Sequence, residues 1–389
     1  MPATGPDSSG SVLRLEPLRA WRFVAGKVSA LGAVTSPPYD VLEPAIVRRL
    51  TDSDLHNMVR LILPRDPELG PGRYDEPARR LAGWQRDGVV VQDQRPALYV
   101  YEQQLGNAVL CGLVGSLGLD PARRVVLPHE EVMPHWVDDR LELMEATDAD
   151  LEPILLAYGD GGVASDAVDA ARSGEPWLEA ETTGAEHRIW RIEDPIVLAA
   201  ISAELATHEA LIADGHHRYA AYLERRRREP SRGGTDVGLA MLVDYNRHPL
   251  TLDPIHRVIP GLDLATVSSR TPTGWRVLPG RVEGVPDRIG VTDGSEWLTL
   301  HSTHGQEAPA VSMLHDLLLP AWGVVEEDIS FHHTLADALA LAGPQQAVVE
   351  LTAPRMDQVL RSALQGVVLP QKATSFGPKP RVGLLFRTL

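Results

Sequence analysis

Helix-like and strand-like segments follow one another irregularly along this chain, and this order constrains its fold more than any other feature. Apolar runs typical of strands lie at 96–105, 109–119, 152–160 and 237–245. The first two follow each other with no helical segment between them, and we predict that they pair. A Rossmann domain needs a crossover helix between successive parallel strands. We therefore predict an α+β fold, in which helices and strands are mixed without strict alternation.

Chain length and one arginine-rich segment predict two domains. A chain of 389 residues has room for about two domains of roughly 100–200 residues each. The arginine run at 225–228 and the EPSRGGT that follows it are typical of a linker or long loop, although four cations also suit the C-terminal end of a solvated helix. We place one domain at 12–228 and a second, mixed region at 235–389.

The segment HNMVRLILP, residues 56–64, contains a short apolar run that ends at a proline. Such a run is typical of a buried strand, and we predict one here. The next segment, PARRLAGWQRDGVVVQD, has apolar residues at helical spacing, a glycine and then a β-branched run. It predicts a helix followed by a strand.

Charge and cysteine content narrow the classes of partner and compartment. The formal net charge is −16, which argues against a general nucleic-acid surface, since such surfaces depend on clustered lysine and arginine. No apolar run approaches the roughly 20 residues that span a bilayer. The single cysteine, Cys111, and the absence of a leader-like start favour a reducing cytoplasm. A homodimer remains open.

The segment LIADGHHRYAAYL, residues 211–223, concentrates residue types that hold phosphate. An apolar run ends at Asp214, Gly215 permits a tight turn, and a helix is predicted to begin near His216. The N-terminal end of that helix and the guanidinium of Arg218 would attract an anion. Asp214 is suited to cap the helix, to orient a histidine or to hold a metal ion. The structural alternative is a capped helix with surface polar groups.

Two further clusters contain residues of the same kinds. LPHEEVMPHWVDDR, residues 127–140, offers Glu130 or Glu131 as a general base and Arg140 as a partner for phosphate, or is simply a solvated loop before a helix. LPQKATSFGPKP, residues 369–380, contains two of only three lysines in the chain. A weaker set lies near the N-terminus and comprises Tyr39, Asp40, His56, Asn57 and Arg60.

Several enzyme classes are excluded by missing motifs. The chain has no G-x-x-x-x-G-K-[ST] loop, no G-x-G-x-x-G after a strand and no G-x-S-x-G elbow. Cys111 lies in an apolar run and is predicted to be a core residue. His216 and His217 are adjacent, so in a helix their side chains point about 100° apart, which disfavours a shared zinc ion.

Ten motifs in one order, among them PPYDV, LPHEE, IADGHHRYAAYL, DPIHRVI and LPQKATSFGPK, resemble the domain of unknown function 1015 family over nearly the whole chain. GHHRYAAYL is similar in turn to the phosphate-binding turn of the ParB and sulfiredoxin superfamily, which includes free-serine kinases. The resemblance implies a ParB/sulfiredoxin-like nucleotide-binding core at 12–228 and a C-terminal region that completes the site.

This resemblance implies a nucleotide-dependent phosphotransferase that acts on a small hydroxylated metabolite such as serine, with ATP or ADP and Mg²⁺ as cofactors. Alternatives are a phosphoserine phosphatase-type reaction at the same site and a nucleotide-binding or hydrolysing switch of the ParB type. The residues expected to act in catalysis are Glu130, Glu131, His216 and Arg140. Those expected to bind the cofactor are Asp214, Gly215, His217, Arg218, Lys372, Thr374 and Lys379, with Asp214 also as the metal ligand.

Overall fold

A computed structural model describes residues 11–63, 72–283, 288–303 and 308–389. Contacts between residues divide the chain into two compact units. Unit 1 comprises residues up to Leu127, Val132–Leu250 and Pro378–Leu389, and unit 2 comprises Pro128–Glu131 and Thr251–Gly377. These limits differ from the predicted domains, because strand β12 (Val237–Asp244) joins the sheet of unit 1 and the last residues of the chain return to the same unit.

Unit 1 is built on a mixed sheet that has nine strands among the described residues. Strands β4 and β5, predicted to pair, form a long antiparallel hairpin, and β12 pairs antiparallel with β5 and parallel with β8. In order across the sheet the strands are β6 (Val126–Leu127), β11 (Ala210–Asp214), β8 (Ile154–Tyr158), β12, β5 (Ala108–Gly118), β4 (Leu98–Leu105), β10 (Ala185–Ile192) and β9 (Leu178–Thr182), and β1 (Leu15–Glu16) also pairs with β5. The α+β prediction is confirmed.

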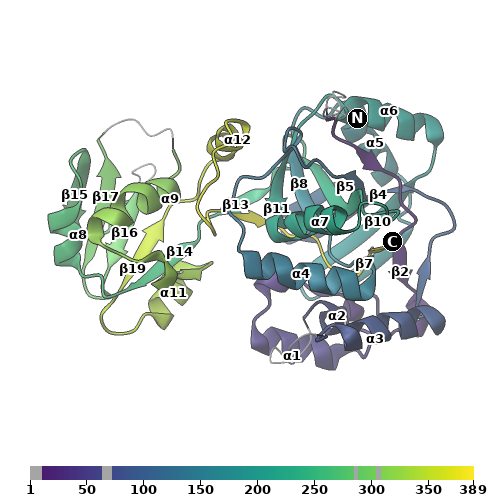
Figure 1. Cartoon of the computed structure of the whole chain (residues 1–389), viewed down its shortest axis with the longest axis horizontal. Coiled ribbons are helices and arrows are strands. Elements are labelled where there is room, and N and C mark those ends of the chain that lie inside the picture. The colour runs from purple at the N-terminus through teal and green to yellow at the C-terminus, as the bar shows by residue number, and fades with distance from the viewer. Residues whose placement is uncertain (1–10, 64–71, 284–287, 304–307) are drawn as a thin grey trace, which may run out of the picture. The chain divides into compact units, whose positions relative to one another are not determined.

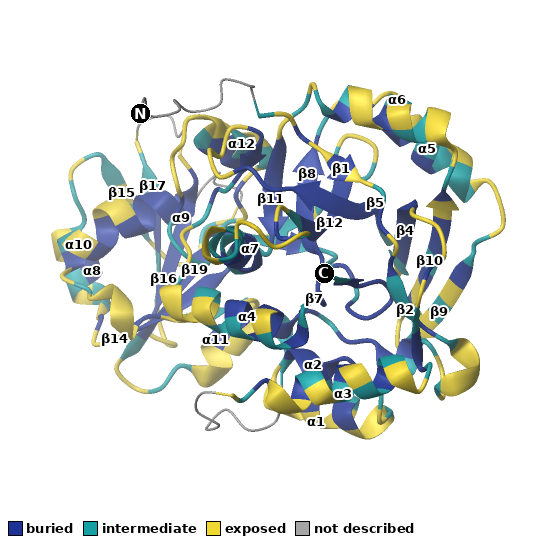
Figure 2. Cartoon of the chain, turned by 45° about the vertical axis from the view of Figure 1, so that its right-hand side comes forward, coloured by how far each residue is buried: buried dark blue, intermediate teal, exposed yellow. Residues whose placement is uncertain are grey.

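Four helices share one apolar core with this sheet. Leu141 and Met144 of one helix, Val168 of a second and Ile201 of a third join Tyr219 of the fourth in this core. The helices are α4 (Pro134–Thr147), α5 (Val163–Arg172), α6 (Pro195–Leu205) and α7 (His216–Arg228). Figure 2 shows β8 and β11 buried along their length, whereas α5 and α6 each present one exposed face.

A second apolar core of unit 1 joins the N-terminal helices to the end of the chain, with Phe23, Trp84 and Phe386 among its members. It contains residues of the helices α2 (Val59–Ile62) and α3 (Asp75–Arg86). The helix α1 (Pro44–Ser53) precedes α2 in the chain. Two short strand pairs contribute to the same core: β2 (Trp21–Phe23) with β3 (Val90–Gln92), and β7 (Ala149–Asp150) with β21 (Arg387–Thr388).

One strand prediction is wrong, because residues 59–62 form the short helix α2. The Asn57 side-chain oxygen accepts the backbone N–H of Val59 at 2.9 Å, and its amide donates to the carbonyl oxygens of Ala33 and Thr35. These bonds hold the chain in a turn just before the apolar run. A buried run of four residues does not distinguish strand from helix by periodicity, so the hydrogen bonds of the preceding Asn57 decide.

Unit 2 contains a six-stranded antiparallel sheet within the described ranges. Its strand order is β15 (Trp275–Pro279), β17 (Trp297–Ser302), β16 (Ile289–Thr292), β19 (Gln346–Leu351), β14 (His256–Pro260) and β18 (Ser330–His332). Five short helices accompany it in the part of the chain described: α8 (Leu264–Arg270), α9 (Ala310–Met313), α10 (Leu319–Trp322), α11 (Leu335–Leu341) and α12 (Met356–Leu364). A separate pair joins β13 (Thr251–Asp253) to β20 (Ser375–Gly377).

Among the described residues, none of the helices combines the length and the apolar character that crossing a bilayer requires.

Candidate functional site

The predicted phosphate-binding turn lies between β11 and α7, and its local geometry requires glycine. Strand β11 ends at Asp214, and Gly215 takes φ 96° and ψ 30°, in the left-handed region. A Cβ atom added to Gly215 would lie 2.8 Å from Cγ2 of Ile154 and 3.1 Å from Cζ of Arg218. Helix α7 then begins at His216, as predicted. The tight turn therefore brings the start of α7 directly onto strand β8, which contains Ile154.

The carboxylate of Asp214 is bound to two cations. One oxygen accepts a hydrogen bond from the guanidinium of Arg218, and the other lies 2.6 Å from the ammonium of Lys379. Lys379 also pairs with Asp40 at 2.5 Å. Burial alone would lower the pKa of Lys379, but the two carboxylates outweigh it and raise that pKa. Lys379 is therefore a permanently charged group held between two acids.

A metal ion at Asp214 would compete with Lys379 and Arg218 for the carboxylate. Among the described residues, no group of three or more His, Cys, Asp or Glu side chains is arranged to hold a metal ion. A divalent cation at Asp214 would have to displace Lys379 or Arg218 from its carboxylate oxygens. Magnesium at this position stays a prediction.

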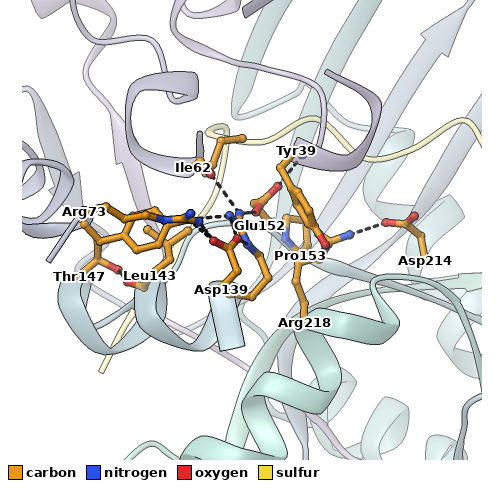
Figure 3. A network of polar contacts seen from close by, with 12 residues as sticks. Tyr39, Ile62, Arg73, Asp139, Leu143, Thr147, Glu152, Pro153, Asp214 and Arg218 are labelled. Carbon is orange, nitrogen blue, oxygen red and sulfur yellow. Dashed lines mark hydrogen bonds and ion pairs between the residues drawn. The ribbon is translucent and has the colours of Figure 1, made fainter. Parts of the chain in front are cut away.

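Arg218 belongs to a buried ion network in unit 1, which Figure 3 shows with Arg218 beside Pro153 and Asp214. It is 2% exposed, and it donates to the carbonyl oxygen of Pro153 at 2.6 Å as well as to Asp214. Burial lowers its pKa, but Asp214 and Glu152 outweigh that effect, and the net shift is upward. Its Nε atom is buried and has no hydrogen-bond partner in the described part of the chain. Arg218 thus keeps its charge although almost none of its surface meets water.

Arg140 belongs to the same network and is even more enclosed, at 1% exposed. Its guanidinium binds Asp139, donates to the Tyr74 hydroxyl at 2.8 Å and to the Ile62 carbonyl at 3.0 Å, and lies 3.4 Å from Glu152. A phosphate that reached Arg140 would have to break these contacts. The assignment of Arg140 to catalysis, as a partner for phosphate, stays a prediction.

Glu152 connects Arg140 to Arg218, and the sequence did not single it out. It accepts the backbone N–H of Tyr39 at 3.1 Å. Burial raises the pKa of its carboxyl, although Arg218 and Arg140 oppose the shift. A lone glutamate before a strand gives no signal in the sequence, so only the fold reveals this role. Asp40, which the sequence marked weakly, gains its role through Lys379.

The N-terminal ends of α4 and α7 lie together in unit 1. The Nε2 atom of His217, in the first turn of α7, accepts the backbone N–H of Met133, which immediately precedes α4, at 3.1 Å. At the other end, Arg225 of α7 pairs with Asp148, the residue after α4, at 3.1 Å. The two helices therefore run parallel (Figure 1). Two positive helix ends at one place form a stronger anion site than one end alone.

The two histidines of the turn differ in their surroundings. His217 accepts a hydrogen bond through Nε2, so this nitrogen carries no proton in the state described. His216 is the first residue of α7 and is buried, at 8% exposed. Its assignment to catalysis stays a prediction.

Three other predicted residues meet in unit 2. One carboxylate oxygen of Glu130 accepts the backbone N–H of Lys372 at 2.8 Å, and the other lies 3.5 Å from the Thr374 hydroxyl. The Thr374 hydroxyl lies 2.8 Å from Nε2 of His129. Burial raises the pKa of Glu130, although Lys372 opposes the shift. A carboxyl with a raised pKa is suited to accept a proton. The neighbouring Glu131 differs from Glu130 in being exposed.

The predicted cofactor-binding residues are therefore divided between the units. Asp214, Gly215, His217, Arg218 and Lys379 belong to unit 1, and Lys372 and Thr374 belong to unit 2 with Glu130. Lys372 has a positive φ of 55°, so the backbone of this loop bends sharply where its N–H meets Glu130. The division between the units falls between Gly377 and Pro378, inside the lysine motif.

Structural comparisons return proteins of low identity. SbnI with a C-terminal truncation from Staphylococcus aureus is 14% identical, covers 70% of this chain and 86% of its own, and has a TM-score of 0.43. A free serine kinase in complex with AMP is 15% identical, covers 72% and 91%, and has a TM-score of 0.41. A variant of a free serine kinase in complex with ADP is 15% identical, covers 68% and 88%, and has a TM-score of 0.41. The ParB/sulfiredoxin-like character of the core stays a prediction.

A search of curated proteins returned no match. A family model described as "Protein of unknown function (DUF1015)" matches residues 15–317, which is most of the chain. This agrees with the family that the ordered motifs resemble. The chain therefore belongs to the DUF1015 family of proteins of unknown function.

Proposed function

We propose that this protein binds the phosphates of a nucleotide at the joined N-terminal ends of α4 and α7 and transfers a phosphoryl group to a small hydroxylated metabolite. The observation that carries the proposal is the meeting of two helix N-termini beside the cations Arg218 and Lys379. Anions bind at helix N-termini because unpaired backbone N–H groups and the helix dipole favour negative charge. Here that feature occurs in a chain whose net charge is −16, so the positive site is local.

The residues of unit 1 fit a phosphate chain through exchange of partners. In the state described, Lys379 and Arg218 are neutralised by Asp40 and Asp214. A phosphate that takes the place of Asp40 or Asp214 beside Lys379 would keep the ammonium paired with an anion, and it would release that carboxylate. A released Asp214 would hold Mg²⁺, which would offset charge on the phosphate oxygens.

The transfer step needs a base for the acceptor hydroxyl. In that step the hydroxyl oxygen bonds to phosphorus, the bond from phosphorus to the leaving nucleotide oxygen breaks, and the hydroxyl proton passes to the base. The sequence predicts Glu130 or Glu131 as this base. Within unit 2, burial raises the pKa of the Glu130 carboxyl and two neighbours fix its orientation. The acceptor class, a serine-like hydroxylated metabolite, rests on the resemblance of the GHHRYAAYL turn to that of free-serine kinases.

Calorimetric titration with ATP, ADP and CTP in the presence of Mg²⁺ tests the phosphate assignment. Lys379→Met should weaken binding at least ten-fold, because it removes a buried cation without adding bulk, whereas Lys27→Met removes the same charge from an exposed site and should leave binding unchanged. Circular dichroism confirms that both variants fold. Unchanged affinity in folded Lys379→Met would contradict the proposal.

Product analysis separates the three reaction classes. Phosphorus NMR of the protein with nucleotide and a panel of hydroxylated metabolites should show a new phosphate monoester that depends on the acceptor. Release of inorganic phosphate from phosphoserine would instead favour the phosphatase-type reaction. Slow nucleotide hydrolysis that ignores every acceptor would favour the ParB-type switch. Glu130→Gln should abolish acceptor-dependent product while nucleotide still binds.

A further inference from the structure

Trp136 is a large aromatic side chain in the first turn of α4, and more than a third of it, 36%, is exposed. Its neighbours are rings. The Tyr39 ring lies 5.7 Å from it, centroid to centroid, at an interplanar angle of 46°, and the His135 ring lies 5.2 Å away at 43°. A single exposed tryptophan is common on protein surfaces and needs no explanation. Trp136 is unusual because other rings support it and because of its place in the fold.

The Tyr39 ring, which contacts Trp136, is itself held in place. Tyr39 is 8% exposed, and its backbone N–H donates to Glu152. The guanidinium of Arg140 lies 4.1 Å from the centroid of the Tyr39 ring. Arg140 is itself held by the buried ion network, so the Tyr39 ring contacts both a fixed guanidinium and the Trp136 ring. A side chain supported in this way loses little conformational freedom when a ligand stacks on its exposed side.

Two hydrogen bonds connect Trp136 to the phosphate-binding turn. The backbone N–H of Trp136 donates to the carbonyl oxygen of Met133 at 3.1 Å, and the N–H of Met133 donates to Nε2 of His217 at 3.1 Å. His217 is the second residue of α7, beside Arg218. The backbone of Trp136 therefore lies within one helical turn of the place where the two helix N-termini meet.

We infer that Trp136 is the platform on which the base of the bound nucleotide stacks. The inference rests on the proposed function, because it assigns the base of a ligand whose phosphates occupy the α7 turn. Stacking on an aromatic ring accepts any base, since every base has a π-face, and it favours the larger purines by contact area. The ligand class is therefore a purine nucleoside di- or triphosphate, in which the phosphates bind to α7 and the base to Trp136.

The test compares ADP with tripolyphosphate, which has phosphates but no base, by calorimetry on the full chain. The wild-type protein should bind ADP more tightly than tripolyphosphate. Trp136→Ala should weaken ADP binding about ten-fold, the equivalent of about 1.4 kcal/mol, and leave tripolyphosphate binding unchanged. Trp136→Phe should recover most of the ADP affinity, because it keeps a ring. Trp275→Ala, the same change in strand β15 of unit 2, is the matched control and should change neither affinity.

Each other outcome overturns a defined part of the inference. If the wild type binds neither ligand, the proposed function fails and the inference fails with it. If both ligands bind but Trp136→Ala leaves ADP affinity unchanged, the inference alone fails. If the substitution weakens both ligands equally, Trp136 supports the phosphate turn structurally and is not a base platform.

Discussion

Replacing Gly215 by alanine should destabilise unit 1, and the structure gives the size of the effect. Alanine at φ 96° occupies a left-handed conformation, which costs about 1–2 kcal/mol. Its Cβ would also lie 2.8 Å from Cγ2 of the fully buried Ile154, and overpacking of this kind costs about 1–3 kcal/mol. Restriction of the unfolded chain returns about 0.4–1 kcal/mol. The expected loss in free energy of unfolding is about 2–4 kcal/mol.

Urea unfolding followed by tryptophan fluorescence measures this loss. Gly26→Ala is the matched control, because a Cβ at Gly26 meets nothing within 4 Å and its φ is not positive. That variant should differ from wild type by no more than about 0.5 kcal/mol. Gly215→Asn separates the two causes, since asparagine tolerates the left-handed region but keeps the Cβ contact with Ile154. Recovery with asparagine would assign the loss to backbone strain.

The same substitution affects the proposed site. The new Cβ would approach Cζ of Arg218 to 3.1 Å and push the guanidinium away from Asp214. ADP affinity should therefore fall together with stability. A Gly215→Ala protein as stable as Gly26→Ala would refute the reasoning, because neither the strain nor the close approach would then be real.

Two further predictions concern groups away from this turn. Burial would raise the pKa of Glu350, but hydrogen bonds from Arg281 and Arg288 outweigh it and lower that pKa to about 2. The stability that this pairing contributes is present above the unfolded-state pKa near 4.5, and it is lost as the pH falls toward 2. In urea titrations, Glu350→Gln should therefore lower the free energy of unfolding of unit 2 at pH 7, and much less at pH 3. Burial raises the pKa of the Cys111 thiol to about 12, so a thiol reagent at pH 8 should modify it only after denaturation, and rapid labelling of the native protein would contradict its placement in the core.

The sequence predicted features whose cause is local. The glycine before a run of helix formers placed the start of α7 at His216, and two adjacent apolar runs predicted the β4–β5 hairpin. Residues 59–62 were misassigned because the hydrogen bonds of Asn57, not periodicity, choose the helix. In each of these elements the deciding information lies within a few residues. The error at 59–62 arose because a short apolar run suits both a strand and a helix.

The ion network could not be predicted, because its members come from distant parts of the chain. The charged members of the network come together only after β8, β11 and the final segment are in place. They span 340 positions of the sequence and are Asp40, Glu152, Asp214 and Lys379. The two lysines at 372 and 379 suggested one anionic site, yet they belong to different units. Proximity in sequence therefore suggested candidate residues for phosphate binding, but it did not show which carboxylates pair with them.

That pairing gives the proposed site a testable property. Lys379 pairs with two carboxylates, Asp40 and Asp214, and both of these negative charges would oppose a phosphate at this ammonium. Asp40→Asn removes one competitor and keeps the shape, and tripolyphosphate should then bind several-fold more tightly without Mg²⁺ than it does to wild type. Asp87→Asn, an exposed change of the same charge, should have no effect. Weaker binding to Asp40→Asn would show that Asp40 positions Lys379 for the phosphate, and a loss confined to titrations with Mg²⁺ would identify Asp40 as a metal ligand.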